Sequence, residues 1–318
     1  MPGARDVREV LGLMPGDPVS WTEHRDGEVL TYTFAGGLVT RAEVPGKDDA
    51  LRILPLTRVQ AALLRRLAQQ PSLVRGKRVF EPFAGSGALG FMALHLGARS
   101  VDFLDINPRA EAFQRWTAAA NGFPEGTVRS LTADLRTHPV AEPYDLILAN
   151  PPFLPTPDCV PGTLTSNGGP DGSRLLALLL DRLDAFLTPE GEAQILLYQP
   201  ARDGVPIVAE VFAESLAGRV VEFTALQRPL LPFPAYRAAY ERRYPAERAR
   251  IRQWAAALEA AHGPDLTVSY YLMRLGPRTA LPGVAPPGPA AVRFVDGHPD
   301  HLLTEDDVDY VPVDGRRR

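Results

Sequence analysis

The chain has 318 residues, of which 45% are hydrophobic and 23% are charged, and its formal net charge is −4. These values are ordinary for a globular protein. They argue against a largely disordered chain and against a protein that coats nucleic acid non-specifically. A single cysteine, Cys159, excludes an intramolecular disulfide framework and a cysteine-rich zinc site, and it fits a reducing compartment.

The N-terminal part of the chain is predicted to be a small β-rich unit over residues 1–55. Apolar and polar residues alternate from Val29 to Val44 around Gly36 and Gly37, which indicates a hairpin. The first ten residues lack the apolar core of a signal peptide, and no apolar run reaches the roughly 18 residues of a membrane-spanning helix. We therefore expect a cytoplasmic protein with no membrane partner.

The next segment, residues 56–200, is predicted to alternate between helices and strands. A helix is expected over 56–70, because Val59 and several leucines recur on one face and Pro71 follows as a stop. The alternation after it implies parallel strands joined by crossover helices. The predicted strands are 78–84, 100–106, 127–135, 144–150 and 193–199, and the predicted helices are 88–96, 108–121 and 173–187.

The pattern changes after residue 200. The expected elements are a helix at 205–215, a strand at 219–226, an Arg- and Ala-rich helical segment at 235–262 and a strand at 265–275. Five prolines between 276 and 290 predict a linker, and partial disorder is expected beyond about residue 310.

A glycine-rich turn after the first of the alternating strands is the first candidate binding segment. The sequence from Glu81 to Gly90, EPFAGSGALG, leads from an apolar strand directly into a helix. Glycine permits a tight turn and the close approach of a ligand, and the helix N-terminus offers free N–H groups. We take Glu81, Phe83, Gly85 and Gly87 as candidate cofactor-binding residues, although such a turn also serves as an ordinary strand-to-helix connection.

Two acidic residues at the ends of the next two strands extend this candidate site. Asp105, with Ile106 beside it, can accept hydrogen bonds from two ribose hydroxyls; its alternative role is a helix N-cap. Asp134 can accept from the exocyclic amine of an adenine ring, with Leu135 on the ring face; the alternative is a simple strand-end turn. Together these residues predict a pocket for an adenosine-type cofactor at the carboxyl ends of parallel strands.

The identity of the adenosine cofactor rests on the turn itself. The chain has no G-x-x-x-x-G-K-[ST] segment, which disfavours a P-loop nucleotide site, but Gly85, Gly87 and Gly90 nearly match the dinucleotide pattern, so NAD stays an alternative. The Glu81 carboxylate would repel a pyrophosphate and would suit a cationic amino group. This favours S-adenosylmethionine, whose methionine part carries an ammonium group.

The fourth strand is followed by Asn150-Pro151-Pro152-Phe153. Two prolines remove two N–H donors and hold the chain extended, which leaves the Asn150 side-chain oxygen and the Pro151 carbonyl as acceptors. These two oxygens can hold both hydrogens of an –NH2 group and aim its lone pair at an incoming methyl group. Phe153 can stack on a planar amide or base. The alternative is a rigid loop with no ligand.

The glycine turn, Asp105, Asp134 and the NPPF segment together resemble class I S-adenosylmethionine-dependent methyltransferases. The resemblance is to the amino-group branch, which includes adenine methyltransferases, ribosomal RNA guanine-N2 methyltransferases and protein-glutamine N5 methyltransferases that act on release factors. It covers residues 56–200 and is more specific to methyl transfer than to the substrate.

The resemblance implies a Rossmann-like, doubly wound α/β fold with a seven-stranded, mostly parallel sheet. The small β-rich N-terminal unit is expected from its own residue pattern. The methyltransferase domain is expected at 56–276, with a helical insertion at about 229–262. A Pro-rich linker and C-terminal tail are expected at 277–318.

The segment 168–172, Gly-Gly-Pro-Asp-Gly, is similar to a segment of the glutamine methyltransferases, and Asp171 either caps the following helix or contacts substrate. The chain departs from that family in its β-rich N-terminal part, where the family has a helical bundle, and in the insertion at 229–262. Both departures suggest a different acceptor.

These observations predict an S-adenosylmethionine-dependent N-methyltransferase. Its expected partner is a methyl acceptor, namely an amide, guanidine or amino nitrogen of a small molecule or a protein side chain. The first alternative is an rRNA or tRNA base N-methyltransferase, for which the β-rich unit would bind RNA. The remote alternative is an NAD-dependent oxidoreductase or a non-catalytic nucleotide-binding module.

Other residues carry weaker signals. Tyr198 and Gln199, at the end of the fifth strand, either face the acceptor or pack in the core. The arginines between 242 and 252 are interspersed with glutamates, which favours a solvated face over a nucleic-acid interface. His298 and His301 lack supporting ligands, so no metal site is expected.

Overall fold

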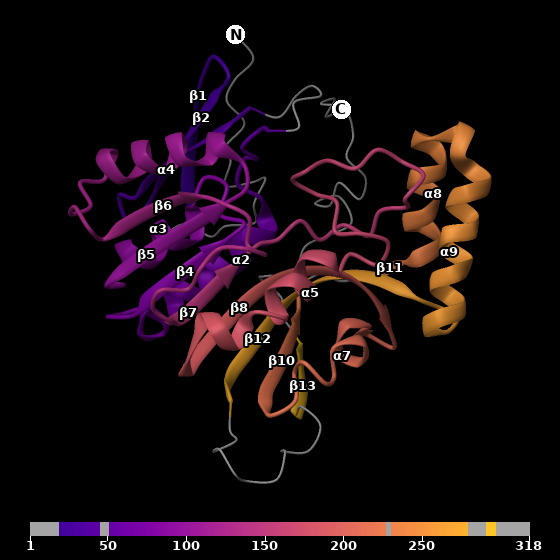
Figure 1. The fold of residues 1–318 in the computed structure, drawn as a ribbon. Helices are drawn as coiled ribbons and strands as arrows, with labels where there is room; N and C mark the ends of the chain where they lie inside the picture. The colour runs from indigo at the N-terminus through magenta and orange to yellow at the C-terminus, as the bar shows by residue number, and fades with distance from the viewer. Residues whose placement is uncertain (1–18, 45–50, 227–229, 279–290, 297–318) are drawn as a thin grey trace. The chain divides into compact units, whose positions relative to one another are not determined.

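The structure is a computed structural model that describes residues 19–44, 51–226, 230–278 and 291–296 (Figure 1). The chain divides into two compact units. Unit 1 comprises Met1–Pro139 and Tyr144–Ala149, and unit 2 comprises Val140–Pro143 and Asn150–Arg318.

Unit 1 contains two sheets. Its N-terminal sheet is antiparallel in the order β1–β2–β3, and its second sheet region is parallel in the order β7–β4–β5–β6. The strands are β1 (Trp21–Asp26), β2 (Val29–Phe34), β3 (Val39–Glu43), β4 (Arg78–Pro82), β5 (Ser100–Asp105), β6 (Val128–Thr132) and β7 (Tyr144–Ala149). The helices are α2 (Arg58–Gln69), the 3-10 helix η1 (Pro71–Leu73), α3 (Ala88–His95) and α4 (Pro108–Ala120).

The N-terminal sheet forms around buried aromatic residues. The ring of Trp21 on β1 lies 6.0 Å from that of Tyr32 and 5.4 Å from that of Phe34, both on β2. The predicted hairpin is β2–β3, and Gly37 in its turn has a φ of +90°, a conformation that favours glycine. The side chain of Asn121, after α4, bonds to both the N–H and the carbonyl of Val39 on β3, so the sheet is attached to this helix.

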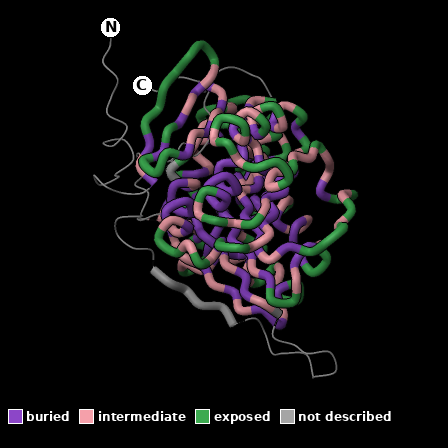
Figure 2. The backbone as a smooth tube through the Cα atoms, turned by 90° about the vertical axis from the view of Figure 1, so that its left-hand side faces the viewer, coloured by how far each residue is buried: buried purple, intermediate pink, exposed green. Residues whose placement is uncertain are grey.

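The parallel strands and the helices that cover them form the core of unit 1. Helix α2 begins at a capping box, in which Thr57 and Gln60 each accept a hydrogen bond from the other's backbone N–H. All but the last residue of α3 are buried, and α3 packs against β4 and β5. Figure 2 draws these buried segments in purple. The result is a rigid frame for the turns at the carboxyl ends of β4, β5 and β6.

Unit 2 contains a mostly antiparallel sheet region in the order β13–β10–β12–β8, in which β13 is parallel to β10. Two short strands pair at its margins, β9 with β8 and β11 with β12. The strands are β8 (Leu187–Arg202), β9 (Val205–Pro206), β10 (Arg219–Ala225), β11 (Leu231–Pro232), β12 (Thr267–Arg278) and β13 (Ala291–Asp296). The helices are α5 (Arg174–Leu180), α6 (Leu183–Phe186), α7 (Val208–Val211), α8 (Phe233–Arg243), the 3-10 helix η2 (Pro245–Glu247) and α9 (Arg248–His262).

The predicted α/β fold class, with its Rossmann-like alternation and a small β-rich N-terminal sheet, is confirmed. All seven predicted strands are present as β4, β5, β6, β7, β8, β10 and β12. The predicted domain boundaries stay a prediction. The linker and tail at 277–318, with the disorder expected beyond 310, lie outside the described residues apart from positions 277–278 and β13, which the sequence did not suggest.

Three helical predictions differ in detail. The helix expected at 173–187 is divided into α5 and α6, and that expected at 205–215 is only the short α7. The segment 235–262 forms two helices, because Pro245 cannot continue α8 and starts η2 instead. The predicted insertion is therefore a pair of helices, α8 and α9, which pack on each other.

Candidate functional site

The predicted site residues fall into two groups. Those in the turns after β4, β5 and β6 belong to unit 1, whereas the NPPF segment, which follows β7 directly in the chain, belongs to unit 2.

The turn after β4 needs its glycines for two different reasons. Gly85 has a φ of +52°, and no described atom within 4 Å would meet a Cβ there, so the space beside it is open to a ligand. Gly87, with a φ of +78°, is the N-cap of α3, and a Cβ on it would lie 2.8 Å from the Phe103 ring. A Cβ on Gly90 would lie 2.4 Å from the same ring, so α3 packs closely on β5. Phe83 adopts a φ of +59°, a strained conformation for a non-glycine residue.

Glu81 lies beneath this turn and is 3% exposed. Its Oε2 accepts a hydrogen bond from the Gly90 N–H at 2.6 Å, so the carboxyl group anchors the first turn of α3. Burial raises the pKa of Glu81 to about 8, against the lowering effect of the backbone hydrogen bonds. A carboxyl group with this pKa is largely protonated at neutral pH, and a cationic group placed beside it would favour its ionised form.

Asp105 joins the turns after β4 and β5. Its Oδ2 accepts from the Gly85 N–H at 2.7 Å and its Oδ1 from the Asn107 N–H at 2.8 Å. Asn107, not Asp105, is the N-cap of α4, because its side chain accepts from the Arg109 N–H. Burial raises the pKa of Asp105. The apolar side chain of Ile106 is 51% exposed beside this carboxylate, as a contact for a ligand ring would be.

Asp134 and Leu135 follow β6 in a different arrangement. The Asp134 carboxylate accepts hydrogen bonds from the backbone N–H and the guanidinium of Arg136, which hold its pKa below the usual range. The backbone N–H of His138 donates to the Asp134 carbonyl, and Leu135 is buried. This is the geometry of a strand-end turn, and a ligand amine would share the carboxylate with Arg136.

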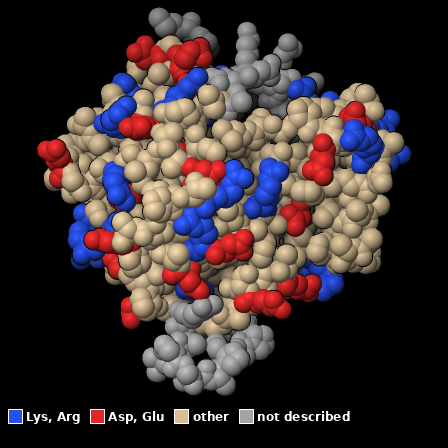
Figure 3. Space-filling view, in the orientation of Figure 1, with Lys and Arg blue, Asp and Glu red and all other residues tan. Residues whose placement is uncertain are grey.

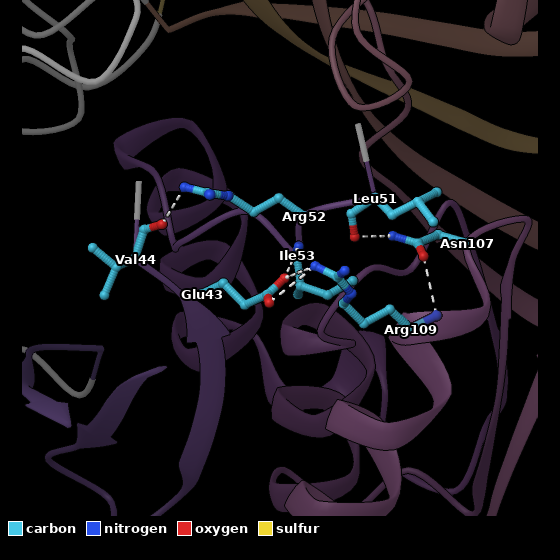
Figure 4. A network of polar contacts seen from close by, with 7 residues as sticks. All are labelled: Glu43, Val44, Leu51, Arg52, Ile53, Asn107 and Arg109. Atoms are coloured by element: carbon cyan, nitrogen blue, oxygen red, sulfur yellow. Dashed lines mark hydrogen bonds and ion pairs between the residues drawn. The ribbon is translucent and has the colours of Figure 1, made fainter. Parts of the chain in front are cut away.

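A polar network connects the Asp105 turn to the N-terminal sheet (Figure 4). Glu43, at the end of β3, accepts from the Ile53 N–H at 2.7 Å and from the Arg109 guanidinium at 3.1 Å. The Asn107 side chain donates to the Leu51 carbonyl at 2.7 Å. Residues 51–53 are thereby held between β3 and the start of α4.

In unit 2, the side-chain oxygen of Asn150 is buried and has no hydrogen-bond partner among the described residues. Pro151 and Pro152 contribute no N–H, as the sequence requires. The Phe153 ring makes an edge contact with the Tyr270 ring of β12, with 5.8 Å between centroids. The predicted acceptor oxygen of Asn150 is therefore unsatisfied.

The segments 150–156 and 166–172, which we call the paired loops, are joined by backbone hydrogen bonds. The Leu154 N–H donates to the Ser166 carbonyl at 2.8 Å, and the Thr156 N–H donates to the Gly169 carbonyl at 2.8 Å. A Cβ on Gly172, whose φ is +81°, would lie 2.4 Å from the Phe153 carbonyl oxygen. The glycines of the Gly-Gly-Pro-Asp-Gly segment thus permit contact with the backbone of the NPPF segment.

Asp171 makes a local turn before α5, whose N-cap residue is Ser173. Its Oδ1 accepts from both the backbone N–H and the hydroxyl of Ser173, at 2.9 and 2.7 Å. Helix α5 has no side-chain capping hydrogen bond, so Asp171 does not cap it, and contact with substrate stays a prediction.

The paired loops are braced by α8 and α9, a role that sequence reasoning missed. The hydroxyls of Tyr236 and Tyr240 on α8 both donate to the Pro155 carbonyl, at 2.8 and 3.0 Å. The Trp254 indole N–H on α9 donates to the Pro170 carbonyl at 2.8 Å. Each loop is therefore hydrogen-bonded to one helix of the insertion. The signal in the sequence is a set of aromatic residues with polar tips in the helical insertion.

The charged surface of the insertion is made of ion pairs. Glu241 lies within 3.1 Å of Arg237 and Arg252 and 3.6 Å of Arg248, and these arginines lower its pKa, with the Arg252 hydrogen bonds as the largest cause. On the face drawn in Figure 3, basic and acidic residues are interspersed. The pattern matches the solvated face expected from the sequence.

Within the described ranges, no three His, Cys, Asp or Glu side chains are grouped as metal ligands. His298 and His301 lie outside those ranges. No helix in the part of the chain that the structure describes has the length and apolarity to span a membrane.

Comparison with known proteins bears on the segment that contains both groups of site residues. Residues 58–160 match the family described as the methyltransferase small domain. This match supports the predicted methyltransferase class, for which S-adenosylmethionine is the cofactor.

Three curated relatives match beyond this segment. The chain is 31% identical over 183 residues to ribosomal protein L11 methyltransferase of Geobacter metallireducens, which covers 52% of this chain and 55% of the relative. It is 28% identical over 138 residues to tRNA1(Val) (adenine(37)-N6)-methyltransferase of Tolumonas auensis, covering 43% and 57%. It is 29% identical over 177 residues to release factor glutamine methyltransferase of Deinococcus radiodurans, covering 52% and 60%. The chain thus spans little more than half the length of each, and their substrates differ.

Proposed function

We propose that this protein transfers a methyl group from S-adenosylmethionine to an amide, guanidine or amino nitrogen of a small molecule or a protein side chain. The observation that carries the proposal is the buried, unpartnered side-chain oxygen of Asn150, directly followed in the chain by two prolines. A buried acceptor without a partner costs free energy, so its persistence is best explained by a ligand that donates to it.

The cofactor would be held by residues of unit 1. The open space beside Gly85 leaves room for a ligand at the carboxyl end of β4. Asp105 would accept from the ribose hydroxyls through its remaining lone pairs, with the exposed Ile106 against the adenine. Glu81 would face the ammonium group of the methionine part. Phe83, Gly87, Asp134 and Leu135 stay predicted contacts. When bound, the sulfonium supplies an activated methyl group.

The acceptor nitrogen would be held by the NPPF segment. The Asn150 side-chain oxygen and the Pro151 carbonyl would each accept one hydrogen of the –NH2 group. This fixes the nitrogen and aims its lone pair, which is delocalised in an amide and therefore weakly nucleophilic. The N–CH3 bond would form as the S–CH3 bond breaks and S-adenosylhomocysteine leaves, and the methylated nitrogen would then release one proton to solvent. Positioning of this kind lowers the barrier without a separate base. Phe153 would lie against the planar group that carries the nitrogen.

A small-molecule or protein acceptor fits the surface better than RNA. The basic residues around Glu241 are already paired, and the drawn face of Figure 3 mixes both signs of charge. A protein that neutralises many phosphates needs unpaired Lys and Arg side chains along one face. A reducing cytoplasmic location belongs to the proposal and is supported by the single cysteine.

The test is a transfer assay with methyl-labelled S-adenosylmethionine against fractionated metabolite, protein and RNA pools. Label is expected in the metabolite or protein fraction. Asn150→Ala should lower turnover about a hundredfold or more, the size of loss seen when one preorganised group is removed from an active site. Its affinity for S-adenosylhomocysteine, measured by calorimetry, should stay unchanged. Label confined to RNA, or full activity of Asn150→Ala, would contradict the proposal.

A further inference from the structure

Strand β8 carries two buried glutamines whose side chains are unpaired. Gln194 and Gln199 are both 0% exposed, and neither amide nitrogen nor amide oxygen of either residue has a hydrogen-bond partner among the residues described. An unpaired buried amide is unfavourable, so two of them on one strand need a reason.

The two glutamines differ in their surroundings. In the pairing of β8 with β12, Gln194 is opposite Arg274, whereas Gln199 is opposite Ser269, near the carboxyl end of β8. Gln199 lies against the paired loops: a Cβ on Gly172 would be 3.1 Å from its Nε2 and 2.4 Å from the Phe153 carbonyl oxygen. The absence of a side chain at Gly172 thus keeps this amide from being covered further.

The paired loops offer the acceptor group few donors. The Asn150 oxygen and the Pro151 carbonyl accept hydrogen bonds, and neither proline has an N–H to donate. The Gln199 Nε2 is an unpaired donor beside the same segment. An –NH2 group held by two oxygens and flanked by a hydrogen-bond acceptor would satisfy all of these atoms.

We propose that Gln199 is an acceptor-binding residue, whose Nε2 donates to the atom adjacent to the amino nitrogen that receives the methyl group. The inference rests on the proposed function and narrows it. The acceptor would carry a carbonyl oxygen or a ring nitrogen beside its –NH2 group, as in a carboxamide or an aminopurine. A guanidinium or an alkylamine has no such neutral acceptor atom, so neither would satisfy the Gln199 Nε2 donor.

The central variant is Gln199→Met, and Gln194→Met is its matched control on the same strand. Methionine has a similar length and no hydrogen-bonding amide, so neither substitution removes a hydrogen bond from the free protein. Both variants should melt at or above the temperature of the parent protein. Gln199→Met should lower kcat/KM for the acceptor about tenfold or more, whereas Gln194→Met should leave it unchanged. Both should keep the parent's affinity for S-adenosylhomocysteine.

A second variant isolates the donor. Gln199→Glu keeps two oxygens and loses the N–H groups, so it should be as impaired as Gln199→Met.

Two probe acceptors, N-acetyl-glutamine methylamide and adenosine, distinguish a carboxamide from an aminopurine. Transfer to either supports the inference, and blocked lysine and blocked arginine should receive no label.

Three results would overturn the inference. One is parent-like kcat/KM in Gln199→Met or in Gln199→Glu, and another is transfer to blocked lysine or arginine. The third is a large fall in melting temperature in Gln199→Met but not in Gln194→Met, which would mean that Gln199 is paired in the free protein. In each of these cases methyl transfer by the parent protein leaves the proposed function standing. A parent protein that neither binds S-adenosylhomocysteine nor labels any pool would overturn both.

Discussion

The candidate polar groups in the turns of unit 1 and those near the paired loops of unit 2 differ in whether they have hydrogen-bond partners. In unit 1 the candidate carboxyl groups already have partners: Glu81 bonds to the Gly90 N–H, and Asp105 bonds to the Gly85 N–H. In unit 2 the Asn150 oxygen and the Gln199 amide have none within the described ranges. If the proposed function holds, the cofactor side is shaped by its own backbone hydrogen bonds, whereas the acceptor side is completed by its ligand.

The largest expected effect concerns the cofactor side. Asp105→Ala should weaken the affinity for S-adenosylhomocysteine about a hundredfold, since it would remove the two proposed charge-assisted hydrogen bonds to the ribose and removes the acceptor of the Gly85 N–H. Asp134→Ala is the comparison, because the Asp134 carboxylate is already engaged by Arg136, and its effect should be smaller. Calorimetric titration measures both. Equal losses in the two variants would remove the distinction between these carboxylates.

The next effect is a pH dependence of stability that arises at Glu81. The pKa of Glu81 is about 8 in the folded protein against 4.5 for an ordinary glutamate, so the folded state keeps a proton that the unfolded chain releases. The free energy of unfolding should therefore fall as pH rises from about 4.5 to about 8, by a few kcal/mol at most at about 1.36 kcal/mol per pKa unit.

Urea unfolding of Glu81→Gln against the parent protein between pH 5 and pH 8.5 tests this. The variant should gain stability relative to the parent as pH rises, and the gain should level off above pH 8. Glu23→Gln, at an exposed position on β1, is the control. A difference between Glu81→Gln and the parent that does not change with pH would contradict the burial argument.

A third prediction concerns the contact between the paired loops. Gly172→Ala should lower the free energy of unfolding by about 2–3 kcal/mol, because a Cβ there meets the Phe153 carbonyl and the φ is positive. Gly122→Ala has a positive φ but open space around the added atom, so it should cost about 1 kcal/mol. Urea unfolding compares the two. Equal costs would show that the loops can separate without penalty.

The smallest expected effect concerns the helical insertion. Trp254→Phe keeps an aromatic ring and removes the N–H that donates to the Pro170 carbonyl, so it should cost about 1 kcal/mol of stability. If α9 positions the paired loops, the KM for the acceptor should rise while the affinity for S-adenosylhomocysteine is unchanged. An unchanged KM would limit α9 to a structural role.

The sequence predicts the strand–helix alternation well, because it depends on local periodicity, and the candidate cofactor group, which stays a prediction, rests on short spacings of the same local kind. Glycines with positive φ, an acidic residue at a strand end and a helix after a turn are all local signals. The bracing of the paired loops is different. Tyr236 and Tyr240 reach a carbonyl more than 80 positions away, and Trp254 does the same. In sequence these are simply aromatic residues of a helix, and their partner is a backbone atom that any residue could supply.

The sequence could not predict that the Gln199 amide has no hydrogen-bond partner among the described residues either. Its place at the end of the fifth strand indicated either a contact with the acceptor or packing in the core, and its lack of a partner among the described residues depends on β12 and the paired loops together. β13 lies in the stretch expected to be the C-terminal tail, and it pairs in parallel with β10. Both features therefore depend on tertiary contacts, which the local sequence does not show.

The polar network of Figure 4 connects the small N-terminal sheet to the turn after β5, which contains Asn107. The Glu43 carboxylate accepts a hydrogen bond from the Arg109 guanidinium. The Asn107 backbone N–H donates to the Asp105 carboxylate, and the Asn107 side chain donates to the Leu51 carbonyl. An engineer who exchanged this sheet for another module would also remove the contacts that hold Asn107 beside the Asp105 carboxylate. A replacement of residues 1–53 should therefore supply substitutes for two hydrogen-bond acceptors, the Leu51 carbonyl and the Glu43 carboxylate.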